Sequence, residues 1–229
     1  MTILYEDNHL LIVNKACGEI VQVDKTGDES LEETLKKWIK EKYNKPGNVF
    51  LGVTHRLDRP VTGVVVFAKT SKALVRLNEQ FKNGEMHKTY LALVKQAPPA
   101  LEATLEQYIW RNEKQNKSYI CDAVKPGAKN AILKYKLLGH SDTYQLLEVN
   151  LMTGRHHQIR CQLAAMGCPI KGDLKYGFPR SNPDGGVSLH AWRIQFVHPV
   201  SGLNIDVIAP LPAEDVVWNY FRIMLEDHR

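Results

Sequence analysis

Apolar and polar positions follow two different periods along this chain, and together they predict both helices and strands. Apolar residues recur at helical spacing after Ser30 and after Thr70, and both of these residues are good N-caps. The first helix is expected to run to about Tyr43 with a capping box, because Glu33 follows Ser30 by three residues. The second helix is expected to end at Gly84.

Short runs rich in Leu, Ile, Val and aromatic residues predict strands. These runs are residues 3–5, 10–13, 64–69, 88–94, 131–135, 144–149, 192–196 and 203–207. A third helix is expected to start at Gly154 under a Thr153 cap and to stop at Gly167, and a fourth to cover about 213–226. Strands and helices mix without a βαβ rhythm or an internal repeat, which favours an α+β fold.

Composition narrows the class of protein. The formal charge of +5 is compatible with a polyanionic partner, and the lysines and arginines are spread widely enough that folding must assemble any basic face. The 4 cysteines form no CxxC pair, which argues against a zinc site and favours reduced thiols in a cytoplasm. We expect no signal peptide, because the first residues lack a positively charged region followed by a long apolar stretch. No apolar run approaches the roughly 20 residues that span a bilayer.

One polar turn stands before a buried strand. In His55-Arg56-Leu57-Asp58, a carboxylate precedes a corner in which Pro60 fixes φ and Gly63 is free to take a positive φ. An Asp at the mouth of a buried strand is placed for chemistry. The alternative is a turn Asp that caps its own backbone, and the residues alone leave both interpretations open.

Two further segments carry polar groups that packing alone does not require. Tyr90 lies in a run of Leu and Val, and His156-His157 stand between Arg155 and Arg160 at the expected start of the third helix. Arg160 should follow His156 by one turn, so this helix start favours polyanions, unless it is an ordinary solvated face. Neighbouring helical residues point about 100° apart, so the two histidines are not expected to share a metal ion.

Taken together, these segments resemble the RluA-type family of RNA pseudouridine synthases. The resemblance rests on motifs that occur in order over most of the chain. They are His55-Arg56-Leu57-Asp58 with Thr62-Gly63, Lys88-Thr89-Tyr90-Leu91-Ala92-Leu93-Val94, Thr153-Gly154-Arg155-His156-His157-Gln158-Ile159-Arg160, Gly167-Cys168-Pro169-Ile170-Lys171-Gly172-Asp173 and Leu189-His190-Ala191. One departure is Ala16, which stands where relatives often have proline. We also expect no separate N-terminal RNA-binding module, because the resemblance begins within the first ten residues.

The resemblance implies a mixed, mainly antiparallel sheet in two halves flanked by helices with a central cleft, formed by residues 1–229 as a single catalytic domain. It implies an RNA pseudouridine synthase that uses no cofactor and no metal. Asp58 would be the nucleophile, Arg160 would pair with it, and Tyr90 would stack on the target base after base flipping. Arg56 would enter the space that the base leaves.

The same resemblance implies a role for four residues in holding RNA. They are His55, Arg56, Arg155 and Lys171. The RNA is expected to be rRNA or tRNA, and the protein is expected to be a cytoplasmic monomer without a membrane partner.

Two other classes of protein compete with this interpretation. An inactive RNA-binding relative would be expected to lack Asp58 or Arg160, and both are present. A glycosidase acting on free nucleosides would need a second carboxylate, for which Glu85 and Asp173 are the candidates.

Overall fold

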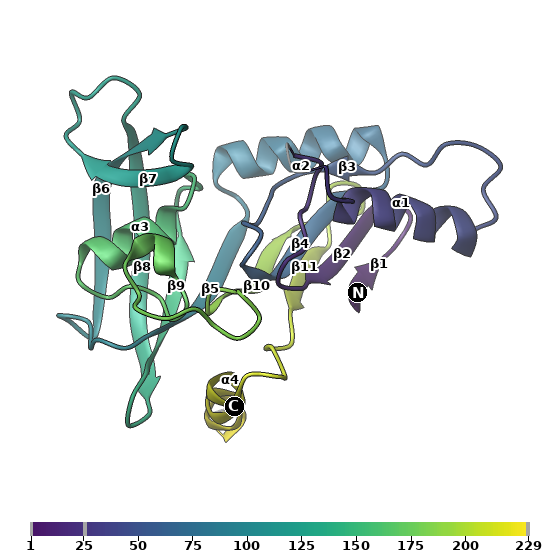
Figure 1. Cartoon of the computed structure of the whole chain (residues 1–229). Coiled ribbons are helices and arrows are strands. Elements are labelled where there is room, and N and C mark those ends of the chain that lie inside the picture. The colour runs from purple at the N-terminus through teal and green to yellow at the C-terminus, as the bar shows by residue number, and fades with distance from the viewer. Residues whose placement is uncertain (1, 25–26, 228–229) are drawn as a thin grey trace. The chain divides into compact units, whose positions relative to one another are not determined.

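The computed structural model describes residues 2–24 and 27–227, which fold as two compact units. Unit 1 comprises the chain up to Met86 together with Trp192–Pro210, and unit 2 comprises His87–Ala191 together with the residues from Leu211 onward. Both units combine helices with strand pairs that are mostly antiparallel, so the predicted α+β class is confirmed (Figure 1). In the described part of the chain, no helix is both long and apolar enough to cross a membrane.

Unit 1 is built on a sheet in the order β1-β2-β4-β10, with β11 paired to β10 and the short β3 paired to β4. Its elements are β1 (Thr2–Glu6), β2 (Leu10–Lys15), α1 (Leu31–Lys42), β3 (Gly52–Val53), β4 (Thr62–Ala68), α2 (Ser71–Asn83), most of β10 (Leu189–Val197) and β11 (Asn204–Ile208). Apolar residues of β2, β4, β10 and β11 form a core with α2. This core anchors β4, and the Asp58 turn leads directly into that strand.

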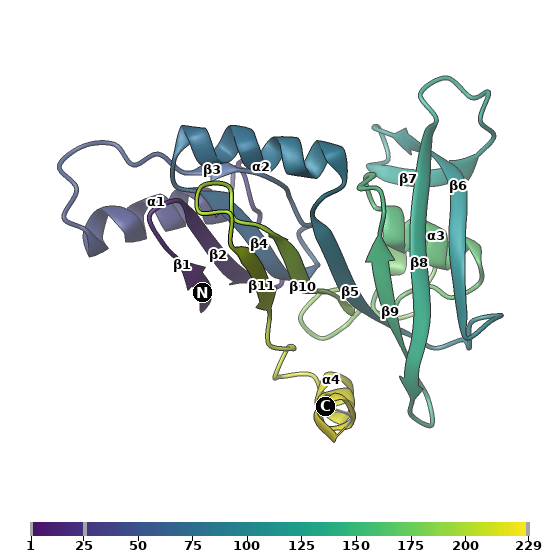
Figure 2. The same ribbon diagram turned by 180° about the vertical axis from the view of Figure 1, so that it is seen from behind.

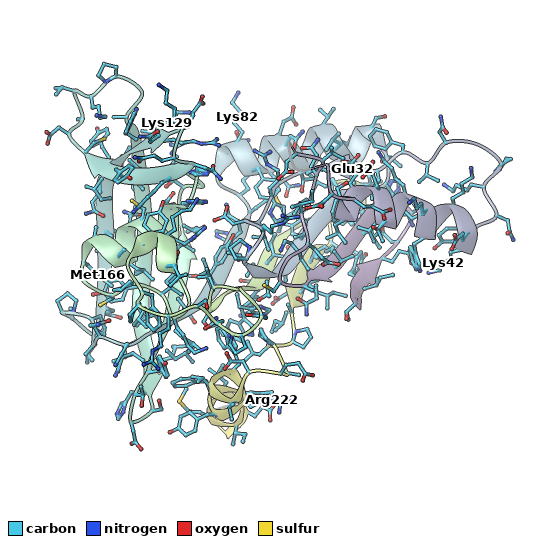
Figure 3. All side chains as sticks on the ribbon, in the orientation of Figure 1. Glu32, Lys42, Lys82, Lys129, Met166 and Arg222 are labelled. Atoms are coloured by element: carbon cyan, nitrogen blue, oxygen red, sulfur yellow. The ribbon has the colours of Figure 1, made fainter. Side chains whose placement is uncertain are left out.

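The first two helices begin where local sequence signals predicted. The Ser30 Oγ accepts a hydrogen bond from the Glu33 N–H at 3.3 Å, and the Glu33 carboxylate accepts one from the Ser30 N–H at 3.0 Å, which completes the capping box. The Thr70 side chain caps α2 through the Ala73 N–H, and Gly84 ends it with φ of 74°. Figure 3 labels Glu32 and Lys42 near the two ends of α1.

Unit 2 is an antiparallel sheet in the order β5-β9-β8-β6-β7. Its elements are β5 (His87–Val94), β6 (Glu102–Asn112), β7 (Lys117–Cys121), β8 (Lys129–His140), β9 (Gln145–Leu151), α3 (Gln158–Ala165), the 3₁₀ turn η1 (Leu174–Tyr176) and α4 (Val216–Asp227). Helix α3 lies on one face of β6, β7 and β8, which Figure 2 shows from the opposite side.

The predicted start of the third helix is wrong. Helix α3 begins at Gln158, and its N-cap is His157 in the left-handed conformation with φ of 52°. Thr153 does not cap it, because the Thr153 Oγ1 accepts from the Ile132 N–H at 2.8 Å and donates to the Gln158 side chain. His156 therefore lies before the helix, so the prediction that His156 and Arg160 share one side of it is also wrong.

Candidate active site

Asp58 lies half-buried in a turn of unit 1, immediately before β4. The Asp58 carbonyl accepts a hydrogen bond from the Val61 N–H at 3.0 Å and closes this turn. Gly63 follows with φ of 115°, which confirms the predicted positive φ. The backbone hydrogen bond thus fixes the position from which the Asp58 side chain extends.

Lys15, at the end of β2, stabilises this turn through hydrogen bonds from its buried side chain. Its side chain is only 1% exposed, and its ammonium donates to three backbone carbonyls: Ala16 at 2.9 Å, Arg59 at 3.1 Å and Val61 at 2.7 Å. Burial lowers the pKa of Lys15 to about 8, although the negative charges of Glu19 and Asp58 oppose that shift. The structure therefore places a buried cation under the turn that carries Asp58.

The segment after Lys15 forms a second connection to the same turn. The Gly18 N–H donates to the Arg59 carbonyl at 3.0 Å, and the Arg59 Nε donates back to the Gly18 carbonyl at 3.1 Å. The Ala16 N–H donates to the Glu19 carboxylate at 2.8 Å, a bond that a proline at this position cannot make. Alanine at position 16 thus allows a hydrogen bond that helps to shape this corner.

His55 is tied to β4. Its Nε2 accepts a hydrogen bond from the Val66 N–H at 3.1 Å, and its ring lies 5.0 Å from the ring of Phe81. Accepting at Nε2 leaves the proton of a neutral imidazole on Nδ1. This geometry anchors the segment before Asp58. Arg56 is exposed. Contact of His55 and Arg56 with RNA stays a prediction.

In unit 2, Arg160 and Asp173 form a buried, bidentate ion pair. The Arg160 Nε and Nη2 donate to the two carboxylate oxygens of Asp173 at 2.7 and 2.8 Å, and the two side chains are 6% and 1% exposed. The guanidinium also lies 5.2 Å from the centre of the Tyr176 ring. The two parallel hydrogen bonds hold the planar guanidinium of Arg160 in one orientation.

Gly172 explains how Asp173 reaches that position. Gly172 has φ of +85°, and a Cβ there would lie 2.6 Å from the Gly186 carbonyl oxygen, so a side chain fits neither the backbone nor the space. Sequence reasoning named Asp173 only as a spare carboxylate and missed its pairing with Arg160. The available signal was the Gly-Asp step within the motif at 167–173.

Tyr90 lies on β5, opposite Val149 in the register, and is 8% exposed. Two positions earlier, burial lowers the pKa of Lys88. Tyr90 and Arg160 both belong to unit 2, whereas Asp58 belongs to unit 1. The pairing of Arg160 with Asp58 and the stacking of Tyr90 on a base stay predictions.

The two adjacent histidines stack on each other, with ring centres 3.8 Å apart. The His157 Nδ1 lies 3.0 Å from the Tyr176 hydroxyl, and burial together with nearby Arg160 lowers the pKa of His157 to about 2. His157 is therefore neutral. No cluster of three metal-ligating side chains occurs among residues 2–24 and 27–227.

Two of the residues predicted to hold RNA make contacts within unit 2. The Arg155 Nε donates to the Asn130 carbonyl at 2.8 Å on an exposed part of the chain. The Lys171 ammonium lies 2.8 Å from the Asp215 carboxylate and 2.9 Å from the Asn182 side-chain oxygen, and its side chain is 12% exposed. Their contact with RNA stays a prediction, and Lys171 already has an anionic partner.

Comparisons with known proteins point to one family. The model of the RNA pseudouridylate synthase family matches residues 9–165. An uncharacterized RNA pseudouridine synthase of Synechocystis is 34% identical over 216 residues, which are 93% of this chain and 66% of the relative. The ribosomal large subunit pseudouridine synthase D of Xylella fastidiosa is 32% identical over 228 residues, with 93% and 67% covered. The chain thus spans about two thirds of the length of these curated relatives.

Solved structures agree. The human RNA pseudouridylate synthase domain containing 1 is 26% identical with a TM-score of 0.71, over 93% of this chain and 86% of that one. The human RNA pseudouridylate synthase domain containing 4 has a TM-score of 0.80 at 24% identity, over 97% and 93% of the two chains, and shows the shared fold. The matched region contains Asp58, Tyr90 and Arg160. This chain belongs to the RNA pseudouridylate synthase family.

Proposed function

We propose that this chain isomerises uridines in large-subunit rRNA to pseudouridine, with Asp58 as the nucleophile. The observation that carries the proposal is the family match over residues 9–165, which includes the Asp58 turn. The large subunit is named because the Xylella fastidiosa relative is a ribosomal large subunit pseudouridine synthase. A cytoplasmic location and a monomeric state stay predictions.

The proposed reaction assigns roles to three residues. Asp58 lets the bond between nitrogen 1 of uracil and ribose break, and the base turns. Carbon 5 then forms the new bond to ribose and loses its hydrogen as a proton, while nitrogen 1 ends protonated. Lys15 positions the Asp58 turn through backbone carbonyls. Arg160, oriented by Asp173, supplies a permanent positive charge for the ionised Asp58.

A uridine inside folded RNA must leave its stack before this chemistry. Extrusion costs on the order of a few kcal/mol. Stacking of the base on Tyr90 returns about 1–3 kcal/mol, and the flat guanidinium of Arg56 fills the vacated space. The proposal therefore includes base flipping.

The glycosidase alternative is disfavoured by the partners of its second carboxylate. Asp173 is buried and bound to both donor nitrogens on one edge of Arg160, so it is not positioned as a general acid. Glu85 lies in unit 1 and accepts a hydrogen bond from Asn83 at 3.2 Å.

The test is tritium release from RNA that carries uridine labelled at carbon 5, because the label leaves only when carbon 5 bonds to ribose. Unmodified rRNA, tRNA and free uridine are each incubated with the wild type and with Asp58→Asn. We expect release from rRNA by the wild type alone. Release from tRNA instead would reassign the substrate. Cleavage of free uridine without tritium release would show a nucleoside hydrolase.

A further inference from the structure

The net positive charge of this chain comes from one segment. Residues 107–136 contain 7 Lys or Arg and 2 Asp or Glu, a net charge of +5. The whole chain has 30 and 25, so the remainder has 23 of each and is neutral. Within this segment, the first part of β8 carries three of the five excess charges, on Lys129, Lys134 and Lys136, while β7 and the end of β6 carry one each. Figure 3 labels Lys129, where β8 begins.

Three aromatic side chains share the outer face of these strands. Ile109 packs with Ala131, Cys161 and Tyr176 in the core beneath α3. Because side chains alternate along a strand, Tyr108 and Trp110 point to the opposite face, which is turned to the viewer in Figure 2. Tyr119 joins them, since it is the register partner of Trp110.

Lysines lie against these rings. The Lys125 ammonium is 4.2 Å from the centre of the Trp110 ring. The Lys117 ammonium is 5.2 Å from the centre of the Tyr119 ring and 5.1 Å from that of Tyr176. The Trp110 and Tyr119 rings lie 6.4 Å apart and are tilted by 32°. We define Tyr108, Trp110, Lys117, Tyr119 and Lys125 as the aromatic–basic face.

Three members of the aromatic–basic face are exposed to solvent, and the other two, Trp110 and Lys117, are half-buried. Tyr108 is 39% exposed and Tyr119 is 36% exposed, and Lys125 is exposed as well. Glu106, a carboxylate on the same side of the sheet, accepts a hydrogen bond from Asn130 at 3.1 Å.

We propose that the aromatic–basic face binds an unpaired segment of the substrate RNA, separate from the uridine that reacts. Single-stranded RNA is bound by exposed rings on which bases stack, combined with cations that contact the backbone. An acidic protein would use the lysines but has no bases to stack on the rings. The inference rests on the proposed function for the identity of the RNA, but not for the binding itself.

The test measures binding of a fluorescently labelled 12-nucleotide oligouridylate by anisotropy, with Asp58→Asn in the whole 229-residue chain. Replacing both Trp110 and Tyr119 by Ala should weaken binding at least tenfold, as expected for the loss of stacked bases. Replacing both by Phe should retain most of the affinity, because the rings remain. The control is Tyr220→Ala, which removes an exposed ring from α4.

The lysines are tested by the salt dependence of the same binding. Lys117→Gln combined with Lys125→Gln should lower the slope of log affinity against log salt by about 1.4, or about 0.7 for each phosphate contact. Lys40→Gln with Lys45→Gln is the matched control, because both lysines are exposed in unit 1. Far-ultraviolet circular dichroism checks the fold of every variant.

Unchanged affinity and unchanged slope in folded variants would overturn the inference. Tritium release by proteins with Asp58 intact separates this result from a failure of the proposed function. If the wild type releases tritium and the Ala variants bind normally, only the aromatic–basic face is refuted. If the wild type releases none while the Ala variants bind weakly, the face is supported and the proposed activity is refuted.

Discussion

The two units each bury one long cation beside residues of the shared motifs, but they surround it with opposite kinds of partner. In unit 1, the Lys15 ammonium donates to three neutral carbonyls. In unit 2, the Arg160 guanidinium faces the carboxylate of Asp173. Neutral carbonyls fix the position of a cation without neutralising its charge, whereas a carboxylate partner does both.

This difference decides which unit responds to pH. Desolvation lowers the pKa of Lys15 to about 8, so its charge changes within an accessible pH range. An arginine stays charged at every such pH. The turn that carries Asp58 should therefore be sensitive to alkali, and the Arg160–Asp173 pair should not.

The largest effect is expected in unit 2. Asp173→Ala removes the buried carboxylate that accepts from two nitrogens of Arg160, which should lower the free energy of unfolding by about 3–5 kcal/mol. The matched control is Asp206→Ala, which breaks the exposed pair with Arg193 and should cost less than about 1 kcal/mol. Urea unfolding monitors both. Equal losses in the two variants would show that burial of the Arg160–Asp173 pair has no special weight.

The next largest effect is expected on catalysis in unit 1. Lys15→Met removes the two hydrogen bonds that Lys15 donates to the Asp58 turn, at Arg59 and Val61, and the third that it donates to Ala16. A misplacement of about 1 Å in a reacting group costs on the order of 100-fold in rate, so tritium release should fall by that order. Lys40→Met, on the exposed side of α1, should leave the rate unchanged. A fully active Lys15→Met protein would refute the positioning role.

Lys15 also gives stability and activity opposite pH dependences. Between about pH 8 and 10.5, the unfolded chain holds a proton that the folded Lys15 has released, so wild-type stability should rise relative to Lys15→Met. Below pH 8 both states are protonated, and the cost of burying the charge is fully present. Activity should fall over the same window, because a neutral amine has two N–H donors for three carbonyls. Unfolding and single-turnover rates at a series of pH values check both trends.

The smallest effect is expected from Glu19, whose carboxylate accepts from the N–H of Ala16. The charge of Glu19 raises the pKa of Lys15, so Glu19→Gln should move the alkaline fall in activity to lower pH, by less than about one unit. The amide oxygen of Gln can still accept from the Ala16 N–H, so stability near pH 7 should change little. A shift to higher pH would contradict the assignment of this limb to Lys15.

The sequence predicted the helix starts that depend on hydrogen bonds between residues close together in the chain. The Ser30 capping box and the Thr70 cap lie within one turn of the helices that they start, and both are observed. The predicted start of α3 was wrong because the Thr153 hydroxyl accepts a hydrogen bond from Ile132, 21 residues away in sequence. Propensity does not register such a tertiary partner.

The site shows the same division. Motif spacing identified Asp58 and Arg160 as candidates, but sequence reasoning missed both groups that hold them. Asp173 is 13 residues from Arg160, and Lys15 is 46 residues from Val61. The available signal for the carbonyls that bind Lys15 was the position of this lysine at the end of the apolar run of β2.

The most direct test of the account is single-turnover tritium release from large-subunit rRNA, with enzyme in excess over RNA. It compares the wild type, Asp58→Asn and the exposed control Asp142→Asn, at concentrations where each protein is shown to bind the RNA. We predict one tritium released per target uridine by the wild type and the control, and none by Asp58→Asn. Equal release by Asp58→Asn would contradict the nucleophilic role of Asp58.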